Sequence, residues 1–439
     1  MVNSAIATPD EKVMDKPNLY RTLLATCIGN GLEWFDIAIY VFFASYIGRA
    51  FFPSQDISSS LLITFASFGV SFIIRPLGAI VLGAYADRAG RKASLLVSIS
   101  LMMLGSLMIA VMPGYATIGM AAPVLIVLAR LIQGFSAGGE FGSSTAFLVE
   151  HFPERKAFIA SWQFATQGAS TLLAAAFGMG LASVLSEQEI QEWGWRIPFF
   201  FGLLIGPVGL YIRRYIHEPP SFQRDLQQEL PAKEIFVRQK TWFFTAIGLM
   251  MVSTAINYVI SYIPTYATQN LKLPSLGAYT SAFVGGVILT VVTPLAGLWA
   301  EKIGRISLMK WSVLLVVLTT YPGFYLLAQQ PSQFNLILLV MWLALLKALY
   351  FSVIPSVMAD LFPSTTRATG IALSYNIAVT LFGGFAPLIC IWLIKLTGDN
   401  LAPSYYLVVL GVFSLMAVYQ ARKSIGQKKT DADFSQAGT

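Results

Sequence analysis

The chain has 439 residues, of which 56% are hydrophobic and only 12% are charged. Soluble domains carry roughly 25% charged residues, so a soluble core cannot hold this much apolar side chain, and the excess must face lipid. The formal net charge of +7 would suggest nucleic acid as a partner of a soluble protein, which makes the placement of the basic residues decisive.

The first twenty residues are polar and of mixed charge, without an apolar core followed by a small-residue cleavage site. They predict a tail over residues 1–21 and argue against a cleaved signal peptide. Cys27 and Cys390 both fall inside apolar segments, in opposite halves of the chain, and offer neither a disulfide framework nor metal-ligand spacing. We therefore expect no metal and no cofactor.

Long apolar segments fill most of residues 22–421, and a helix needs roughly 20 apolar residues to cross the hydrocarbon core of a bilayer. The sequence thus predicts an all-α membrane protein with twelve transmembrane helices. The predicted spans are residues 22–48, 59–86, 93–113, 117–145, 157–185, 195–213, 241–266, 277–300, 307–328, 333–359, 368–395 and 402–421.

Basic residues gather in alternate loops. One set of loops, together with both terminal segments, carries most of them, among them Arg88, Arg91, Lys156, Arg305 and Arg367. The opposite loops hold little beyond Arg49, Lys272 and Lys395. The positive-inside rule places the first set of loops and both termini in the cytoplasm. The net positive charge is then explained by the membrane topology, and nucleic acid is not expected as a partner.

Two short patterns occur twice, about half a chain apart. Gly83–Lys92 (GAYADRAGRK) recurs in weaker form at Gly297–Arg305 (GLWAEKIGR), and Glu150–Arg155 matches Asp360–Arg367. Six helices per half, with each half starting on the same side, imply parallel repeats about an axis along the membrane normal. The predicted organisation is a first bundle (22–213), a cytoplasmic linker (214–240), a second bundle (241–421) and a C-terminal tail (422–439).

Motifs along the whole chain carry a family resemblance. Gly83–Lys92 resembles the signature loop of the major facilitator superfamily, and Leu128–Gly134 resembles its fourth-helix motif. Four more segments are similar to the metabolite:proton symporter family within it, namely Gly29–Asp36, Phe72–Gly78, Gly138–Phe141 and Glu192–Phe199. The resemblance covers about residues 20–420. It implies the major facilitator fold of two pseudo-symmetric six-helix bundles, and proton-coupled secondary transport by alternating access.

Two late segments, Leu381–Gly384 and Leu396–Pro403, are similar to the citrate and tricarballylate proton symporters. This resemblance implies import of a small organic anion, most simply a di- or tricarboxylate, together with protons. We expect a monomer in the bacterial inner membrane, with the lipid bilayer, the anion and protons as its partners. Import of a zwitterion such as proline or betaine, or of a monocarboxylate such as shikimate, is the alternative.

Five ionisable residues lie well inside the predicted spans, which makes each a functional-site hypothesis: Glu33, Asp36, Arg75, Arg130 and Lys347. Glu33 and Asp36 are three residues apart and share a helix face. Two nearby carboxylates in a poorly hydrated site repel each other, so that one can hold or release a proton near neutral pH. We predict that this pair couples transport to protons. The alternative is that one of the two acids braces Arg75 or Arg130.

The three cations are predicted to bind the substrate. A guanidinium stays charged and can grip a carboxylate with two hydrogen bonds, which suits Arg75 and Arg130. Lys347 belongs to the second half and departs from the family motif, and a cation there would face the two arginines across the cavity. Such a set suits two or more carboxylates. The alternatives are internal salt bridges for the arginines and snorkelling toward a polar edge for the lysine.

Further site residues are predicted with less direct signals. Polar and aromatic side chains that could line the cavity are Tyr40, Gln133, Gln163, Tyr258, Tyr350 and Asn376. Glu140 is a third candidate for proton coupling, with a gate or a structural pair as its alternative. The resemblance implies a cytoplasmic latch between the halves, formed by Asp87, Arg88, Arg91, Glu150, Arg155, Asp360 and Arg367; solvated loop charge is the alternative.

Rival classes of function are less well supported. An enzyme is not expected, because the two histidines, His151 and His217, lie in predicted loops and no nucleophile–base arrangement appears. A channel would show steady current instead of saturable uptake. A zwitterion needs one cationic contact and one aromatic or acidic contact, so it would leave two of the three cations without partners. Glu33 and Asp36 argue against a facilitator that does not couple to protons.

Overall fold

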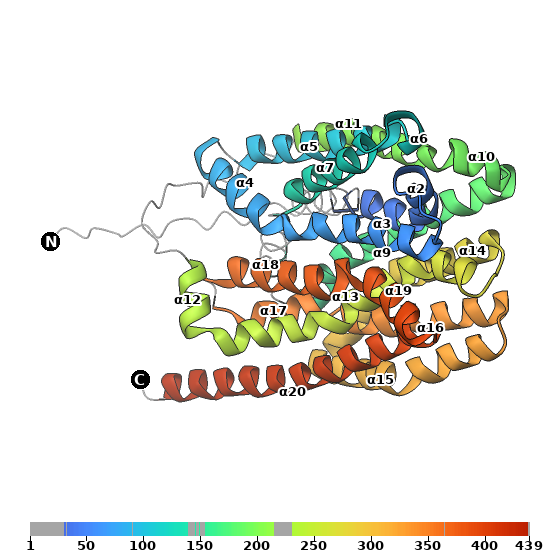
Figure 1. Ribbon diagram of the computed structural model, residues 1–439. Coiled ribbons are helices and arrows are strands. Elements are labelled where there is room, and N and C mark those ends of the chain that lie inside the picture. The colour runs from blue at the N-terminus through green and yellow to red at the C-terminus, as the bar shows by residue number, and fades with distance from the viewer. Residues whose placement is uncertain are drawn as a thin grey trace.

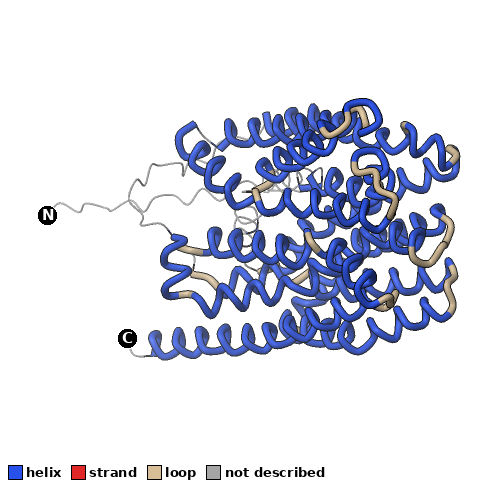
Figure 2. Tube along the Cα trace, in the orientation of Figure 1, coloured by secondary structure: helices blue, strands red, loops and turns tan. Residues whose placement is uncertain are grey.

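The computed structural model describes residues 30–31, 33–89, 91–138, 145, 149, 154–214, 231–363 and 365–437. Side chains are described within these ranges except at 83–84, 86–89, 91–95, 204–205, 208–214, 231–233 and 428–437. Helices and short connecting loops make up the described residues, which contain no strand (Figure 2).

The described part of each of the twelve predicted spans is mostly helical. In the first half the helices are Glu33–Phe42, α2 (Ala44–Phe51), α3 (Ile57–Ile73), α4 (Arg75–Ala89), α5 (Arg91–Val111), α6 (Tyr115–Ile118), α7 (Ala121–Ser136), α9 (Lys156–Val184), α10 (Glu187–Glu192), the short 3-10 turn Gly194–Arg196, and α11 (Ile197–Arg214). In the second half they are α12 (Pro231–Arg238), α13 (Lys240–Gln269), α14 (Ser275–Ile303), α15 (Arg305–Gln329), α16 (Gln333–Phe351), α17 (Ile354–Leu361), α18 (Arg367–Ala378), the π-helix η2 (Val379–Gly384), α19 (Ala386–Thr397) and α20 (Ala402–Ala437).

Within the described residues, eight helices are long and apolar enough to cross a membrane, and a ninth is counted if the bent pair Glu33–Phe42 and α2 forms one span. α5 and α7 are shorter but apolar. Large hydrophobic side chains on the outer faces are exposed, for example Ile80, Val124, Phe244 and Met416. A soluble protein would bury such a surface, so these faces fit a lipid environment. The chain is therefore a multi-pass membrane protein.

The helices run alongside one another in two layers that correspond to the two halves (Figure 1). α5, α7 and α11 lie in one layer, and α13, α15 and α20 lie in the other. α12 and the C-terminal end of α20 lie at one end of the bundle, which we call the linker end. α10 lies at the opposite end, which we call the α10 end. α12 lies inside the predicted linker, and α20 continues helically through the predicted C-terminal tail to Ala437.

Several spans are broken, and the breaks lie close to the buried polar residues. The first span bends by 70° after Phe42. The second is interrupted at Ile74, just before Arg75 and Pro76, where proline cannot supply a backbone N–H to the helix. The eleventh passes through η2, and π-turns of this kind occur frequently at functional sites.

The two halves meet most closely along α9 and α14. A Cβ atom on Gly168 would lie 2.7 Å from the Leu289 carbonyl carbon, and one on Gly286 would lie 2.6 Å from the Leu172 Cα. Small residues allow transmembrane helix backbones to approach in this way. This contact holds the two halves together.

Candidate functional site

Asp36 lies in the first bundle, fully enclosed by side chains from other helices and only 4% exposed. The hydroxyl of Ser106, on α5, donates to Asp36 Oδ1 at 2.5 Å. The amide of Gln133, on α7, donates to Asp36 Oδ2 and also to Ser106 Oγ at 3.0 Å. Two hydrogen bonds therefore stabilise the carboxylate, and no ion pair within 4.0 Å joins it to a described cation.

Arg130 is connected to Asp36 through the same amide. Its Nη1 donates to Gln133 Oε1 at 2.6 Å, and its Nη2 donates to Ser71 Oγ at 3.4 Å. The guanidinium carbon lies 4.3 Å from the ring centre of Tyr40, so the cation also interacts with an aromatic face. Arg130 is 1% exposed, and its Nε has no hydrogen-bond partner. One donor of this buried cation is thus available to another acceptor.

Tyr40 is fixed by this arrangement. Its hydroxyl shares a hydrogen bond of 2.7 Å with Ser67 on α3, and its ring stacks on Phe68. The ring of Phe68 is also 5.0 Å from the Arg130 guanidinium carbon. Tyr40 and Phe68 therefore form an aromatic wall beside the cation.

Glu33 and Arg75 form the second acid–base contact of the first bundle, at 3.5 Å. The guanidinium of Arg75 lies 4.3 Å from the ring centre of Phe72, and its Nε has no hydrogen-bond partner. The pairing agrees with the alternative that one of the two acids braces an arginine. Buried ion pairs are costly to desolvate and costly to break, so Glu33 is better placed to hold Arg75 than to exchange a proton.

Lys347, on α16, is completely buried in the second bundle. Its ammonium donates to Asn257 Oδ1 on α13 at 2.5 Å and lies 4.5 Å from the ring centre of Phe351. No carboxylate among the described residues lies within 4.0 Å of this ammonium. Snorkelling is excluded because the side chain reaches no surface.

An aromatic cluster joins the two halves between these charges. Tyr258, on α13, packs against Trp34, Phe68 and Phe72 of the first half, with ring centres 5.6 to 6.0 Å apart. Its buried hydroxyl has no hydrogen-bond partner. Tyr258 therefore presents a free polar atom in the region where the two bundles meet.

The remaining predicted lining residues differ in what they contact. Gln163 accepts a hydrogen bond from Thr145 at 2.8 Å through its side chain, and its backbone oxygen accepts one from Asn30 at 2.7 Å. Asn376 bridges the halves by donating to the Gly138 carbonyl at 3.1 Å. Tyr350 donates its hydroxyl to the Leu249 carbonyl at 2.9 Å, a contact internal to the second bundle.

At the linker end, polar contacts connect the halves. Asp360 interacts with Lys156 of the first half at 3.3 Å and with Arg305 of its own half at 2.7 Å. Glu301 accepts the backbone N–H of Ala157 at 2.7 Å. A carboxylate at a helix N-terminus is stabilised by the helix dipole, so Glu301 holds the first turn of α9.

The other predicted gating residues contribute less to the described contacts. The Nε of Arg367 donates to the Ala359 carbonyl at 3.0 Å, and Arg155 is exposed just before α9. The side chains of Asp87, Arg88 and Arg91 lie outside the described parts of the structure, as do Glu140 and Glu150.

The α10 end is closed by different contacts. Lys395 on α19 donates to Asp56, the N-cap residue of α3, at 2.7 Å. This hydrogen bond is the main reason why the pKa of the Asp56 carboxyl lies well below its usual range. Glu187 accepts hydrogen bonds from Tyr46 at 2.9 Å and from Ser275 of the second half. Polar contacts between the two halves thus cross both ends of the bundle.

The partners that were not predicted as site residues from the sequence include Ser106, Lys156 and Glu301. Ser106 gives no signal, because a single hydroxyl in an apolar span commonly bonds to its own helix. Lys156 appeared only as part of the basic loops. Glu301 could have been found, since it occupies the position in the second copy of the repeat that Asp87 occupies in the first.

Comparison with known proteins agrees with this architecture. A sequence profile described as Major Facilitator Superfamily matches residues 26–387. The chain is 36% identical over 408 residues to the citrate-proton symporter of Klebsiella pneumoniae, with 92% of each chain covered. It is 31% identical over 426 residues to the proline/betaine transporter of Salmonella typhimurium, covering 94% of this chain and 85% of the relative.

Among solved structures, a proton:xylose symporter bound to a bromodeoxyglucose superimposes with a TM-score of 0.75. The match covers 94% of this chain and 97% of that one, at 16% sequence identity, so it supports the fold alone. Taken together, the sequence match, the relatives and the shared fold establish that the chain belongs to the major facilitator superfamily.

Proposed function

We propose that the protein is a proton-coupled symporter that imports a di- or tricarboxylate such as citrate or tricarballylate by alternating access. The transporting unit is a monomer in the bacterial inner membrane, with the linker end and both termini in the cytoplasm. The relatives named as citrate-proton symporters support this substrate class, and the basic loops support the orientation.

Lys347 is the observation that carries the substrate class. Three buried cations, Arg75, Arg130 and Lys347, occur with two acids, Glu33 and Asp36, in the described interior. An ion buried in a bilayer costs several kcal/mol unless it is paired or hydrated. One carboxylate of the substrate would neutralise the ammonium of Lys347. The other carboxylates of the substrate would reach the Nε atoms of Arg75 and Arg130, which have no hydrogen-bond partner. A monocarboxylate could satisfy only one of these cations.

The side-chain amide of Gln133 links substrate binding at Arg130 to proton binding at Asp36. Its Oε1 accepts from Arg130 and its Nε2 donates to Asp36. A substrate carboxylate that binds Arg130 competes with Gln133 Oε1, and a turned amide no longer donates to Asp36. Without this hydrogen bond the carboxylate of Asp36 accepts a proton more readily than before. Asp36 is therefore the residue that we assign to proton coupling. Glu33, which is paired with Arg75, keeps that arginine in place.

Radiolabelled citrate uptake into proteoliposomes with an imposed inward proton gradient tests the proposal. We expect saturable accumulation that collapses when a proton ionophore is added. Accumulation unaffected by the ionophore would contradict proton coupling, and steady current without saturation would indicate a channel.

Competition with proline, glycine betaine and shikimate tests the substrate class in the same vesicles. The proline/betaine relatives make this comparison necessary. Excess proline or betaine should leave citrate uptake unchanged. Transport of either zwitterion in place of citrate would overturn the carboxylate assignment and leave Lys347 without its proposed role.

A further inference from the structure

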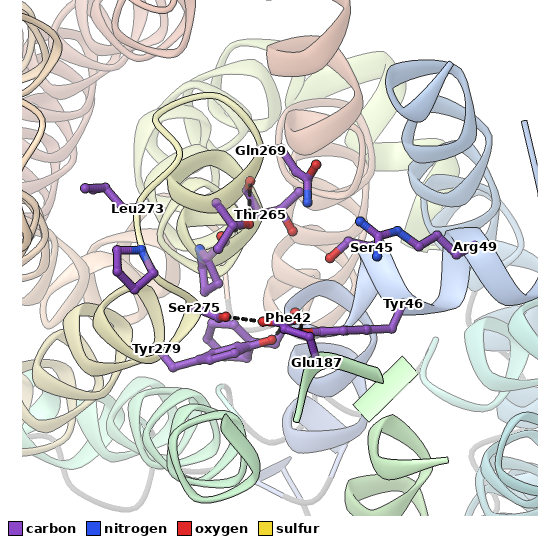
Figure 3. Close-up of a pocket in the computed structure, with 13 residues that line it drawn as sticks. Phe42, Ser45, Tyr46, Arg49, Glu187, Thr265, Gln269, Leu273, Ser275 and Tyr279 are labelled. Carbon is purple, nitrogen blue, oxygen red and sulfur yellow. Dashed lines mark hydrogen bonds between the residues drawn. The ribbon is translucent and has the colours of Figure 1, made fainter. Parts of the chain in front are cut away.

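A cavity of about 320 Å³ opens between the two halves at the α10 end. Its wall is formed by α2, the start of α10, the last turns of α13 and the start of α14 (Figure 3). Binding pockets for small molecules begin at roughly 300 Å³, so the cavity can hold a small organic acid. It is separate from the five ionisable residues that we call the central site, and none of these lines it: Glu33, Asp36, Arg75, Arg130 and Lys347.

The cavity contains polar groups that have no partner within the protein. Arg49 lines it, and no carboxylate of the described residues lies within 4.0 Å of its guanidinium. The guanidinium points toward the side where Thr265 and Gln269 lie (Figure 3). Thr265 is 1% exposed, and its Oγ1 has no hydrogen-bond partner. A buried hydroxyl without a partner carries a desolvation cost, which an acceptor in the cavity would relieve.

The cavity ends inward at an aromatic floor. Tyr279 donates its hydroxyl to the Phe42 carbonyl at 3.2 Å, and its ring stacks on Phe43. Phe42 is followed inward along the same helix by Tyr40 and Asp36, six residues from Phe42. At a rise of 1.5 Å per residue, Asp36 lies about 9 Å below the floor. The floor therefore separates the cavity from the central site by less than two helical turns.

The wall also carries one acid, whose oxygens are both engaged. Glu187 accepts from Tyr46 through Oε2 and from Ser275 through Oε1. It therefore joins α2 to α14 across the mouth. Each oxygen of Glu187 already accepts one hydroxyl proton. The groups of the cavity without a partner among the described residues, the Arg49 guanidinium and the Thr265 hydroxyl, can both donate, and donors favour an anion.

We propose that this cavity is a capture site, in which Arg49, Thr265 and Gln269 hold a carboxylate of the substrate before the Phe42–Tyr279 floor opens. This inference rests on the proposed transport of carboxylates and on the proposed outward orientation of the α10 end. Capture at the outer face would raise the substrate concentration directly above the central cations.

Transport from the two sides of the membrane tests the site. Arg49→Gln removes an exposed charge that pairs with no described acid, so the fold should be preserved. We expect the KM for external citrate to rise by about 1.5-fold to fivefold, the range for an exposed charge contact. The KM for efflux from preloaded, uniformly oriented vesicles should stay unchanged. Lys272→Gln is the matched control, because it removes the same charge at the same end from a residue outside the lining.

Glu187→Gln gives the opposite expectation. It keeps an acceptor for one hydroxyl but removes a negative charge from the wall, so the external KM for citrate should fall. Equal effects of Arg49→Gln and Lys272→Gln, or equal changes of influx and efflux KM in Arg49→Gln, would overturn the capture site, because both results indicate general surface charge or altered folding.

Binding measurements separate this inference from the proposed function. Saturation-transfer NMR with citrate as the probe is applied to the Lys347→Gln protein, in which the central site is weakened. A residual citrate signal that weakens severalfold in the Arg49→Gln, Lys347→Gln double variant, but not in the Lys272→Gln, Lys347→Gln double variant, supports the capture site even if citrate is not transported. A residual signal that Arg49→Gln leaves unchanged, or no residual signal, refutes it, while uptake by the wild-type protein decides the proposed function independently.

Discussion

Replacement of Lys347 by glutamine is expected to weaken binding of a tricarboxylate strongly. The ammonium is completely buried and donates to Asn257 at 2.5 Å, so water screens it little. A hydrogen bond that involves a charged group contributes about 1.5 to 3 kcal/mol, which corresponds to about 10- to 150-fold in affinity. Glutamine keeps a donor for Asn257 Oδ1, and the neighbouring helix therefore retains its polar partner.

Equilibrium binding of radiolabelled citrate to purified protein measures this effect directly. Lys310→Gln is the matched control, since the Lys310 ammonium lies 5.2 Å from the ring centre of Trp311 and 5.8 Å from that of Tyr419, and both rings are exposed. Lys347→Arg should recover part of the affinity, because it restores the charge in a different shape. Comparison of citrate with a dicarboxylate analogue shows whether the lost contact belongs to a particular carboxylate.

An unchanged citrate affinity in Lys347→Gln would refute the assignment of this residue to the substrate. A loss of thermal stability together with an unchanged affinity would assign the lysine to packing. An affinity that falls equally in Lys347→Gln and Lys310→Gln would point to a general charge effect and would also contradict the reasoning.

Three further predictions concern coupling and closure. Asp36→Asn should abolish proton-driven citrate accumulation but keep citrate counterflow, since the amide cannot exchange a proton; loss of counterflow as well would show that the residue is needed for binding. Glu301→Gln should weaken the contact with the first turn of α9 by about 0.3 to 1 kcal/mol. Spin-label distances across the linker end should then show a larger open population than in Glu234→Gln, a control in α12; equal populations would contradict a role of Glu301 in holding the halves together. Because the pKa of Asp56 is lowered, its contact with Lys395 is complete above the usual carboxyl pKa of about 4 and is lost only as the pH falls further. Lys395→Gln should therefore leave the shape of the citrate uptake profile between pH 5 and 8 unchanged. A shifted profile would implicate this contact in proton coupling.

The sequence alone predicted the architecture because the bilayer imposes lengths and charge placement. Apolar runs long enough to span the hydrocarbon core occur at fixed places in the chain, and the described part of each of them is mostly helical. The repeat of Gly83–Lys92 indicated two similar halves. The motifs indicated the family, which the comparisons confirmed. The cost of burying charge likewise identified Glu33, Asp36, Arg75, Arg130 and Lys347 as notable, since such residues are rare in spans.

The tertiary structure decided which groups meet. Glu33 pairs with Arg75, whereas Asp36 is hydrogen-bonded by Ser106 and Gln133, although both acids share one helix face. Each residue turns a helix by about 100°, so the partner of a side chain depends on how separate helices are rotated and packed. Segments far apart in the chain fix those rotations, as Gly168 and Gly286 do between α9 and α14. The sequence by itself determined which residues must be buried, and packing alone determined what each of them contacts.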